Sequence, residues 1–369
     1  MKALLTQRWE EGVADLDSTS RVLLDRIQRS FPLVSRPYEA LAVGLGLSEA
    51  EVRERIGLLK EHRQIRQISA IFNTGALGYR SSLVAMAVDQ EQMDHAARVV
   101  NAYPGVSHNY LRPGRYNMWY TIAVPPGGEL EHTVDVLSRA AGEWPTLILP
   151  ALRKYKLAVV LDVLEEGESD AAFDQPGRPM TEAREPFQAT PDNLRMVRCI
   201  QEDLPLVERP FAQWAHTLDL PEAGLLERIA RWLHLGFIRR FAAVLNHRQV
   251  GFNANGMVVW ACPEARIDES GIILSSHAEV SHCYHRPAHP EWPFNLYAMI
   301  HGRTVEDCHA VAQRLAEAIH LPDHLILFST REFKKIRLKL FWEDSIKQDS
   351  VAVEAGAPTG QMEPMSTTP

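Results

Sequence analysis

The chain has 369 residues, of which 46% are hydrophobic and 23% are charged, as is typical of a folded globular protein. This length exceeds what one hydrophobic core usually serves, so it indicates two domains or two repeats of a smaller unit. The net charge of -8 excludes a general attraction to phosphate or to an anionic membrane. Any contact with nucleic acid would therefore need a local basic patch.

The four cysteines form no C-x-x-C pair, so the sequence signals neither a thiolate zinc site nor a disulfide framework. No apolar run approaches the roughly 20 residues of a membrane-spanning helix. The segment before Ser18 carries four acidic groups and no apolar signal core. We therefore expect a cytoplasmic protein.

Two segments recur in the second half of the chain, in the same order. Phe31–Tyr38 reads FPLVSRPY and Leu204–Phe211 reads LPLVERPF, while Val106–Pro113 reads VSHNYLRP and Val280–Pro287 reads VSHCYHRP. This self-similarity indicates two diverged copies of one unit, fused in tandem. Copy two has four extra residues, which enter within Ala288–Pro293.

The first part of each copy is predicted to be helical. Apolar residues at helical spacing predict a helix over 21–31, and a proline suits the first turn of a second helix over 37–43. Ser48 with Glu51 three residues later is a capping-box pattern, which predicts a third helix over 48–62. Three short helices of this kind are typical of a helix-turn-helix unit. Copy two repeats the three predicted helices at 195–202, 210–218 and 221–235.

The second part of each copy changes to strand-like periodicity. In copy one the predicted strands are 65–72, 82–88, 106–111, 118–124 and 152–162, and the predicted helices are 93–102 and 129–144. After the first strand, this order is that of a ferredoxin-like (βαββαβ) domain, in which helices cover one face of an antiparallel sheet. The predicted fold class is therefore α+β, with the other face of each sheet free to pair or to bind a ligand.

The region between the copies is rich in Glu, Asp, Gly and Pro, which is typical of a linker, and the C-terminal tail has the same character. The predicted domains are an N-terminal extension (1–17), a helix-turn-helix unit (18–72) and ferredoxin-like domain (73–162) of copy one, a linker (163–190), a helix-turn-helix unit (191–245) and ferredoxin-like domain (246–345) of copy two, and a disordered tail (346–369).

The repeated VSH segment carries the candidate chemistry. In a strand, side chains two residues apart share a face, so each copy would present a histidine, a tyrosine and an arginine side by side. A single strand histidine is more often structural than catalytic. The same pattern in both copies adds weight to the functional interpretation, and the structural one stays open beside it.

These segments carry a family resemblance. A helix-turn-helix unit followed by a ferredoxin-like domain resembles the Lrp/AsnC family of transcription regulators, over 18–162 and 191–345. More narrowly, VSHNYLR together with Trp292–Tyr297 (WPFNLY) and Met299–Gly302 (MIHG) resembles the siroheme decarboxylases, and the two-copy chain resembles the fused form of their paired subunits. The resemblance implies loss of CO2 from the C12 and C18 acetates of siroheme, giving 12,18-didecarboxysiroheme, in haem d1 or siroheme-dependent haem biosynthesis.

The implied chemistry assigns roles to the residues of the repeated segment. An acetate on a pyrrole leaves as CO2 when the ring accepts a proton, and a histidine is suited to supply that proton. The candidate catalytic residues are His282, His108, Tyr284 and Tyr110, the tyrosines orienting the histidines or relaying protons.

Substrate binding has its own candidates. Siroheme carries eight carboxylates, and arginine binds carboxylates while staying charged. The candidate carboxylate ligands are Arg286, Arg112 and Arg115, and the candidate walls against the macrocycle are Trp292, Trp119 and Phe294. The insertion and the WPFN segment place the main catalytic site in copy two, with copy one completing the pocket or holding a weaker one.

No organic cofactor and no protein metal site is expected, because the substrate brings its own iron, which a histidine could instead ligate. The expected ligands are siroheme and its decarboxylated products, the halves are expected to form an internal pseudo-dimer through their sheets, and downstream haem-biosynthesis enzymes are candidate partners. Two alternatives remain: a DNA-binding regulator of the Lrp/AsnC type, and a tetrapyrrole sensor without turnover. The third helix of copy one carries four glutamates against three basic residues, so we do not expect DNA binding.

Overall fold

The computed structural model describes residues 16–157, 183–245, 254–302 and 304–342. Most of the predicted N-terminal extension and linker, and all of the predicted tail, lie outside the described residues. Within the described ranges, no helix is long and apolar enough to cross a membrane.

The first helix-turn-helix unit forms as predicted. Its helices are α2 (Ser18–Arg29), α3 (Pro37–Val43) and α4 (Glu49–Glu61). Asp17 caps α2 by accepting a hydrogen bond from the Ser20 amide. Ser48 and Glu51 form the predicted capping box at the start of α4. The helix boundaries therefore follow from local capping chemistry.

The second helix-turn-helix unit has the same organisation, and its helices are α7 (Pro191–Ile200), α8 (Pro210–Thr217) and α9 (Glu222–Leu235). Gly236 ends α9 in the left-handed conformation, with a φ of 82°. Buried side chains of both units, among them Leu23, Ile56 and Ile229, belong to one hydrophobic core. The two units therefore pack the halves of the chain together.

The repeated PLVxRP segment joins the two units. Arg36 pairs with Glu49 at the start of α4 and lies 3.9 Å from Glu208 of copy two. In the reverse direction, Arg209 pairs with Glu222 at the start of α9 and donates to the Ser35 hydroxyl of copy one at 3.1 Å. Basic groups beside the third helix of each unit are therefore engaged within the protein, where a DNA-binding unit would present them to phosphate.

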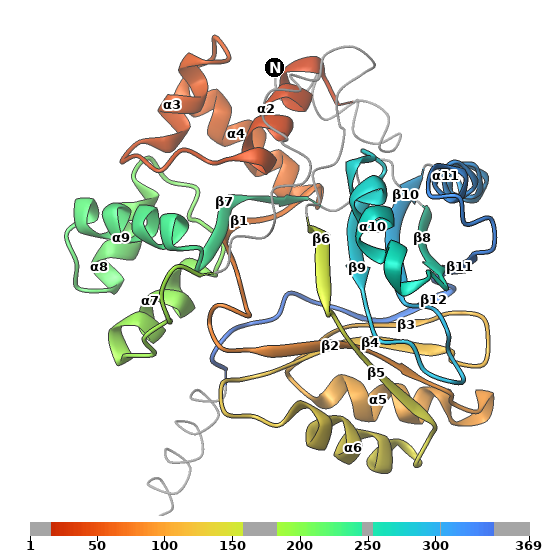
Figure 1. Cartoon of the computed structure of the whole chain (residues 1–369). Coiled ribbons are helices and arrows are strands. Elements are labelled where there is room, and N and C mark those ends of the chain that lie inside the picture. Colours follow the sequence, from red (N-terminus) through yellow and green to blue (C-terminus); the bar gives the residue numbers. More distant parts are fainter. Residues whose placement is uncertain (1–15, 158–182, 246–253, 303, 343–369) are drawn as a thin grey trace, which may run out of the picture.

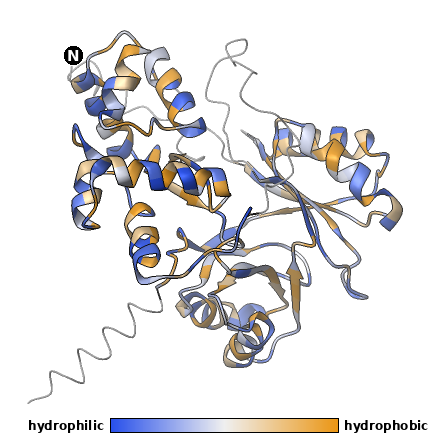
Figure 2. Ribbon diagram, turned by 60° about the vertical axis from the view of Figure 1, so that its left-hand side comes forward, coloured by the Kyte–Doolittle hydropathy of each residue, from blue (hydrophilic) through white to orange (hydrophobic). Residues whose placement is uncertain are grey.

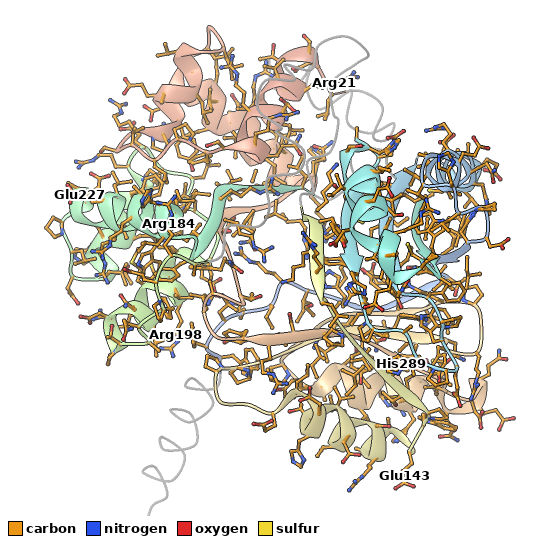
Figure 3. The ribbon with its side chains drawn as sticks, viewed as in Figure 1. Arg21, Glu143, Arg184, Arg198, Glu227 and His289 are labelled. Atoms are coloured by element: carbon orange, nitrogen blue, oxygen red, sulfur yellow. The ribbon has the colours of Figure 1, made fainter. Side chains whose placement is uncertain are left out.

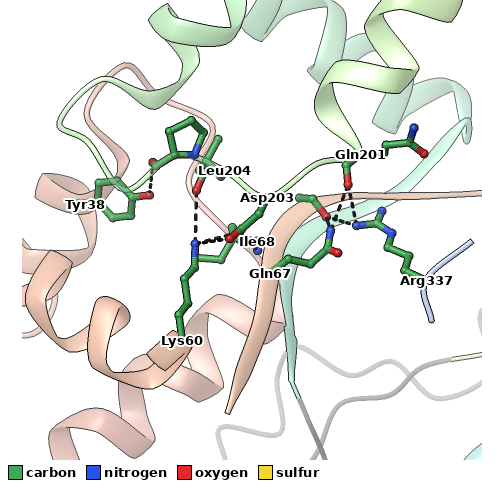
Figure 4. A network of polar contacts seen from close by, with 10 residues as sticks. Tyr38, Lys60, Gln67, Ile68, Gln201, Asp203, Leu204 and Arg337 are labelled. Carbon is green, nitrogen blue, oxygen red and sulfur yellow. Dashed lines mark hydrogen bonds and ion pairs between the residues drawn. The ribbon is translucent and has the colours of Figure 1, made fainter. Parts of the chain in front are cut away.

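A two-stranded antiparallel ribbon connects these units to the rest of the molecule. It consists of β1 (Ile65–Phe72) from copy one and β7 (Ile238–Leu245) from copy two. Asp203, before α8, accepts hydrogen bonds from Lys60 of α4 and from the Ile68 amide of β1, at 2.9 and 2.8 Å (Figure 4). The ribbon thus belongs equally to both halves.

Two five-stranded sheets form the remainder of the protein (Figure 1). In copy one the elements are β2 (Arg80–Met86), the 3-10 turn η1 (Gln90–Gln92), α5 (Met93–Ala102), β3 (Val106–Leu111), β4 (Met118–Val124), α6 (Leu130–Ala141), β5 (Thr146–Pro150) and β6 (Arg153–Leu157). In copy two they are β8 (Ala254–Trp260), the 3-10 turn η3 (Glu264–Arg266), α10 (Ile267–Ser276), β9 (Val280–His285), β10 (Leu296–Gly302), α11 (Val305–Ala318), β11 (Leu325–Phe328) and β12 (Arg331–Lys335). The predicted α+β class is confirmed.

The last strand predicted for copy one pairs with a different strand from the one expected. The segment 152–162 was expected to close the sheet of copy one, but β5 closes that sheet beside β2. Strand β6 instead crosses to copy two and pairs with β9, while β12 crosses to copy one and pairs with β3. Periodicity identifies a strand without identifying its neighbour. The sheet orders are consequently β12-β3-β4-β2-β5 and β11-β8-β10-β9-β6.

The free faces of the two sheets pack against each other. Helices α5 and α6 cover one face of the first sheet, and α10 and α11 cover one face of the second (Figure 1). Each helix carries both apolar and polar segments, as expected of helices with one buried and one exposed side (Figure 2). The opposite faces share one hydrophobic cluster that includes Trp119 and Leu149 of copy one and Met257 and Tyr297 of copy two. The halves therefore form the expected internal pseudo-dimer.

Candidate functional site

The histidines of the two VSH segments occupy matching positions in the two sheets. His108 on β3 lies between Thr121 of β4 and Lys335 of β12, and His282 on β9 lies beside Met299 of β10. The residue that follows each histidine is fully buried: Asn109 in copy one, and Cys283, which belongs to the core beneath the helices of copy two. Because side chains alternate along a strand, the two histidines point to the face away from the helices.

Both imidazoles are half-buried and have low proton affinity. Burial lowers the pKa of His108 to about 4, helped by the positive charges of Lys335 and Arg66. Burial lowers the pKa of His282 to about 3, helped by His301, Arg239, His108 and Arg286. Both histidines lie on the helix-free sheet faces, which pack against each other, and His108 contributes to the pKa shift of His282. The two repeated segments therefore converge from different sheets on one region.

Further cations line this region. Lys154 of β6 has a lowered pKa because it is buried and lies near Arg239 and Arg286. Arg66 and Arg239 occupy equivalent places on the ribbon strands β1 and β7. In Figure 3, side chains project into the space between the ribbon and the sheets. Sequence reasoning missed Arg66, Arg239, Lys154 and Lys335, because the strand exchange and the ribbon that bring them here are tertiary features.

The two predicted tyrosines accompany their histidines. The ring centroids of His108 and Tyr110 lie 6.1 Å apart, and those of His282 and Tyr284 lie 6.0 Å apart. Burial raises the pKa of Tyr284, so its hydroxyl keeps its proton at neutral pH. The structure thus brings the four candidate catalytic residues together in two matching pairs.

Arg112 and Arg286 have a partner that the sequence did not predict. Each is buried and donates from Nη1 to a backbone carbonyl of the opposite half, Arg112 to Leu327 and Arg286 to Leu149. The Arg286 guanidinium also lies 4.6 Å from the ring centroid of Tyr284. Both arginines therefore hold the halves together, and their predicted use as carboxylate ligands stays a prediction for their remaining N–H groups.

The predicted wall residues lie in the contact between the halves. Trp119 is 1% and Trp292 is 8% exposed, and their ring centroids are 5.3 Å apart. Phe294 packs on Trp292 with a centroid distance of 4.8 Å. Arg115 is exposed and pairs with Glu291 of the insertion at 2.9 Å. Protein contacts thus already cover these indoles, which leaves little of their surface for a macrocycle.

The insertion that contains these contacts lies away from the helix-turn-helix units. Its His289 is found at the end of the sheets opposite to those units (Figure 3). The ribbon cations, by contrast, lie on the side of the helix-turn-helix units. The structure therefore connects the insertion with Trp119 and Arg115 of copy one, and connects the histidines with the ribbon.

The hydrogen bonds of the two histidines differ. In copy one the Ser107 hydroxyl contacts His108 Nδ1 and the Thr121 hydroxyl, both at 2.9 Å. In copy two the Ser281 hydroxyl contacts His282 Nδ1 at 2.9 Å and His301 Nε2 at 2.6 Å. Sequence reasoning did not assign His301 a role, and cross-strand spacing is the signal that could have identified Ser281 as its partner.

No group of three or more His, Cys, Asp or Glu residues in the described ranges is arranged to hold a metal ion. Two surface hollows lie elsewhere. One is lined by Arg195, Asp219 and Arg228 of the second helix-turn-helix unit, and the other by Phe294 and His324. Neither contains the paired histidines.

The architecture defines a class of protein: two fused copies of a helix-turn-helix unit with an AsnC-like domain. The model of the AsnC-like ligand binding domain matches residues 76–156 and 249–334. The model of the siroheme decarboxylase NirDL-like HTH domain matches residues 20–66 and 194–239. Both models thus match twice, once in each copy.

The comparison with whole proteins is more specific. A siroheme decarboxylase of Hydrogenobacter thermophilus is 38% identical over 323 residues, covering 87% of this chain and 95% of that protein. The crystal structure of the siroheme decarboxylase NirDL in co-complex with an iron-uroporphyrin III analogue matches with a TM-score of 0.69 and 33% identity, covering 92% of this chain and 99% of that one. The chain belongs to the siroheme decarboxylase family.

The halves also match separate subunits. A siroheme decarboxylase beta subunit of Methanosarcina barkeri is 40% identical over 148 residues, which is 40% of this chain and 97% of that subunit. A single subunit of the two-subunit enzymes therefore corresponds to about one half of this chain. The predicted fused form is confirmed.

Proposed function

We propose that this protein is a carboxy-lyase that removes CO2 from the C12 and C18 acetates of siroheme, giving 12,18-didecarboxysiroheme for haem d1 or siroheme-dependent haem synthesis. The observation that carries this proposal is the convergence of His108 and His282 among the cations of the ribbon and the exchanged strands. Family membership supports it, since the relative from Hydrogenobacter thermophilus is a siroheme decarboxylase.

The cations suit a ligand with many carboxylates. Burying several positive charges side by side costs free energy unless anions compensate them. Arg239 and Lys154 are both mostly buried, and their pKa values are lowered because burial disfavours the charged forms. An octacarboxylate such as siroheme supplies the missing negative charge, and we propose Arg239, Lys154, Arg66 and Lys335 as its ligands beside the predicted arginines.

The histidines suit the proton transfer. Replacing a carboxylate by hydrogen consumes one proton for each CO2 that leaves. With pKa values of about 3 and 4, His282 and His108 are neutral imidazoles at neutral pH in the free protein, each with one N–H and without the second proton that an acid would give. Ligand carboxylates nearby favour the imidazolium and raise these pKa values toward neutrality. The proton is therefore loaded when the substrate binds and is given to the macrocycle when CO2 departs.

The proposal includes no cofactor beyond the iron that the substrate carries. The test is anaerobic incubation of the purified chain with siroheme alone, followed by mass spectrometry. We expect a product lighter by two CO2. Binding of siroheme with no change in mass would instead make the protein a sensor, and tight sequence-selective DNA binding at low salt would favour a regulator.

A further inference from the structure

A hydrogen-bonded chain that copy one lacks runs behind His282. His301 on β10 pairs in register with Asn255 on β8, and its Nδ1 contacts the Asn255 side-chain oxygen. Its Nε2 contacts the Ser281 hydroxyl at 2.6 Å, and that hydroxyl contacts His282 Nδ1 at 2.9 Å. The order is therefore Asn255, His301, Ser281 and His282, across three neighbouring strands.

The donors in this chain can be assigned from one end. The Asn255 oxygen can only accept, so His301 Nδ1 carries the hydrogen and Nε2 of the neutral ring is an acceptor. The Ser281 hydroxyl then donates to His301 Nε2, because that contact is shorter than its 3.3 Å contact with the Met299 carbonyl. The Ser281 oxygen is left to accept from His282 Nδ1. His282 is thereby held with its hydrogen on Nδ1.

In copy one, the hydrogen bonds behind His108 have no fixed donor and acceptor order. The positions that match His301 and Asn255 are Ala123 and Ser81, which pair with each other on β4 and β2. His108 Nδ1 faces the Ser107 hydroxyl, which faces the Thr121 hydroxyl in turn. A pair of hydroxyl groups can reverse its donors, so nothing fixes which nitrogen of His108 carries the hydrogen.

We propose that His301, fixed by Asn255, is a positioning residue that sets Nε2 of His282 as the atom that takes up and delivers the proton. This inference rests on the proposed decarboxylation. In the balanced step, the imidazolium gives its Nε2 hydrogen to the macrocycle, the acetate leaves as CO2, and solvent later returns one proton to Nε2. Through Nδ1, the ring stays bound to Ser281 throughout.

The charged surroundings are compatible with this role. His282 faces His301, Arg239, His108 and Arg286, and His301 faces Lys335, all of which disfavour a proton in the free protein. Neutral His301 is therefore available as an acceptor for the Ser281 hydrogen. Outer partners of this kind orient the ring that performs the chemistry, as they do for metal-bound histidines.

The first test is a tautomer measurement on the free full-length protein. Histidine labelled with nitrogen-15 is observed by NMR, and the His282→Gln variant identifies the signals of His282. We expect the Nδ1–H form in the wild type, a mixture of both forms in His301→Ala, and recovery in His301→Gln, whose amide oxygen can accept from Ser281. An unchanged Nδ1–H form in His301→Ala would overturn the proposal.

The second test is kinetic. We expect His301→Ala to lower kcat by about 10- to 100-fold with KM retained, and to shift the pH profile of kcat. His309→Gln replaces a histidine on α11 that takes no part in these hydrogen bonds, and this variant should match the wild type. Wild-type kcat and pH profile in His301→Ala would refute the role of His301. A wild type without decarboxylation would refute the proposed function alone, because the tautomer measurement needs no turnover.

Discussion

Copy one and copy two share one fold and differ in what surrounds their histidines. His108 has two hydroxyl groups behind it and Lys335 beside it, whereas His282 is backed by a second imidazole and an amide. The backbone pairing of the central strands is the same in both sheets. The comparison teaches that the functional difference lies in the cross-strand neighbours, while the repeated segment itself is common to both.

Replacing the two histidines tests the comparison most directly. We expect His282→Ala to lower the decarboxylation rate by about 100- to 10,000-fold, the range that general acid–base catalysis usually contributes. His108→Ala should lower it less, because nothing fixes the tautomer of that ring. Product formation from siroheme, followed by mass spectrometry, measures both. If His108→Ala is inactive while His282→Ala keeps the wild-type rate, the halves have been assigned the wrong way round.

The ribbon cations allow a second test. Arg239 lowers the pKa of His282 and Arg66 lowers that of His108, from equivalent positions. Loss of a charged hydrogen bond to a carboxylate is worth about 1.5–3 kcal/mol, so Arg239→Ala should weaken siroheme binding by about 10- to 100-fold. Titration followed by the siroheme absorbance gives the Kd. Arg314→Ala, on α11 in the exposed pair with Glu279, serves as the control. Equal losses of affinity in the two variants would show that the ribbon does not contact the substrate.

Variants of Arg286 and Arg112 distinguish a role in holding the halves together from a role in binding siroheme. Each donates to a carbonyl of the other half, so Arg286→Met and Arg112→Met should each lower the free energy of unfolding by about 1–3 kcal/mol, as expected when a buried acceptor loses its donor. Urea denaturation measures this loss. A variant that keeps its stability and loses only siroheme affinity would show that the guanidinium serves as a substrate ligand.

The pH dependence of stability tests the burial of the histidines. The pKa values of His108, His301 and His282 lie at about 4, 4 and 3, below the ordinary value of a histidine. The unfolded chain therefore binds more protons, and stability falls as the pH drops below about 6.5. Each histidine contributes at most about 1.4 kcal/mol per pH unit. Urea denaturation between pH 7 and 5 measures the slope, which should flatten in His108→Gln; an unchanged slope contradicts the burial of that ring.

Local patterns were sufficient to predict much of the fold. The capping box at Ser48 and the strands 106–111 and 118–124 depend on residues close in sequence, and the structure has them at these positions. The two copies were recognised by comparing the sequence with itself. The exchange of β6 and β12 could not be predicted, because alternation identifies a strand face without naming the strand beside it. His301 was missed for the same reason, since its partners Ser281 and Asn255 are neighbours only through sheet register.

The strand exchange has a consequence for synthesis of the chain. The β6 strand is synthesised before its partner β9, so β9 can pair with β6 as soon as it forms. The first sheet is completed later, because its edge strand β12 is synthesised after the rest of that sheet. Thr330, which donates to the Leu111 carbonyl at the start of the β12 pairing, follows Leu111 by 219 residues. At about 5–20 residues per second, the β3 edge stays open for about 10–40 s. An open strand edge is a template for aggregation, so the earlier half of this protein is the one that needs protection while the later half is made.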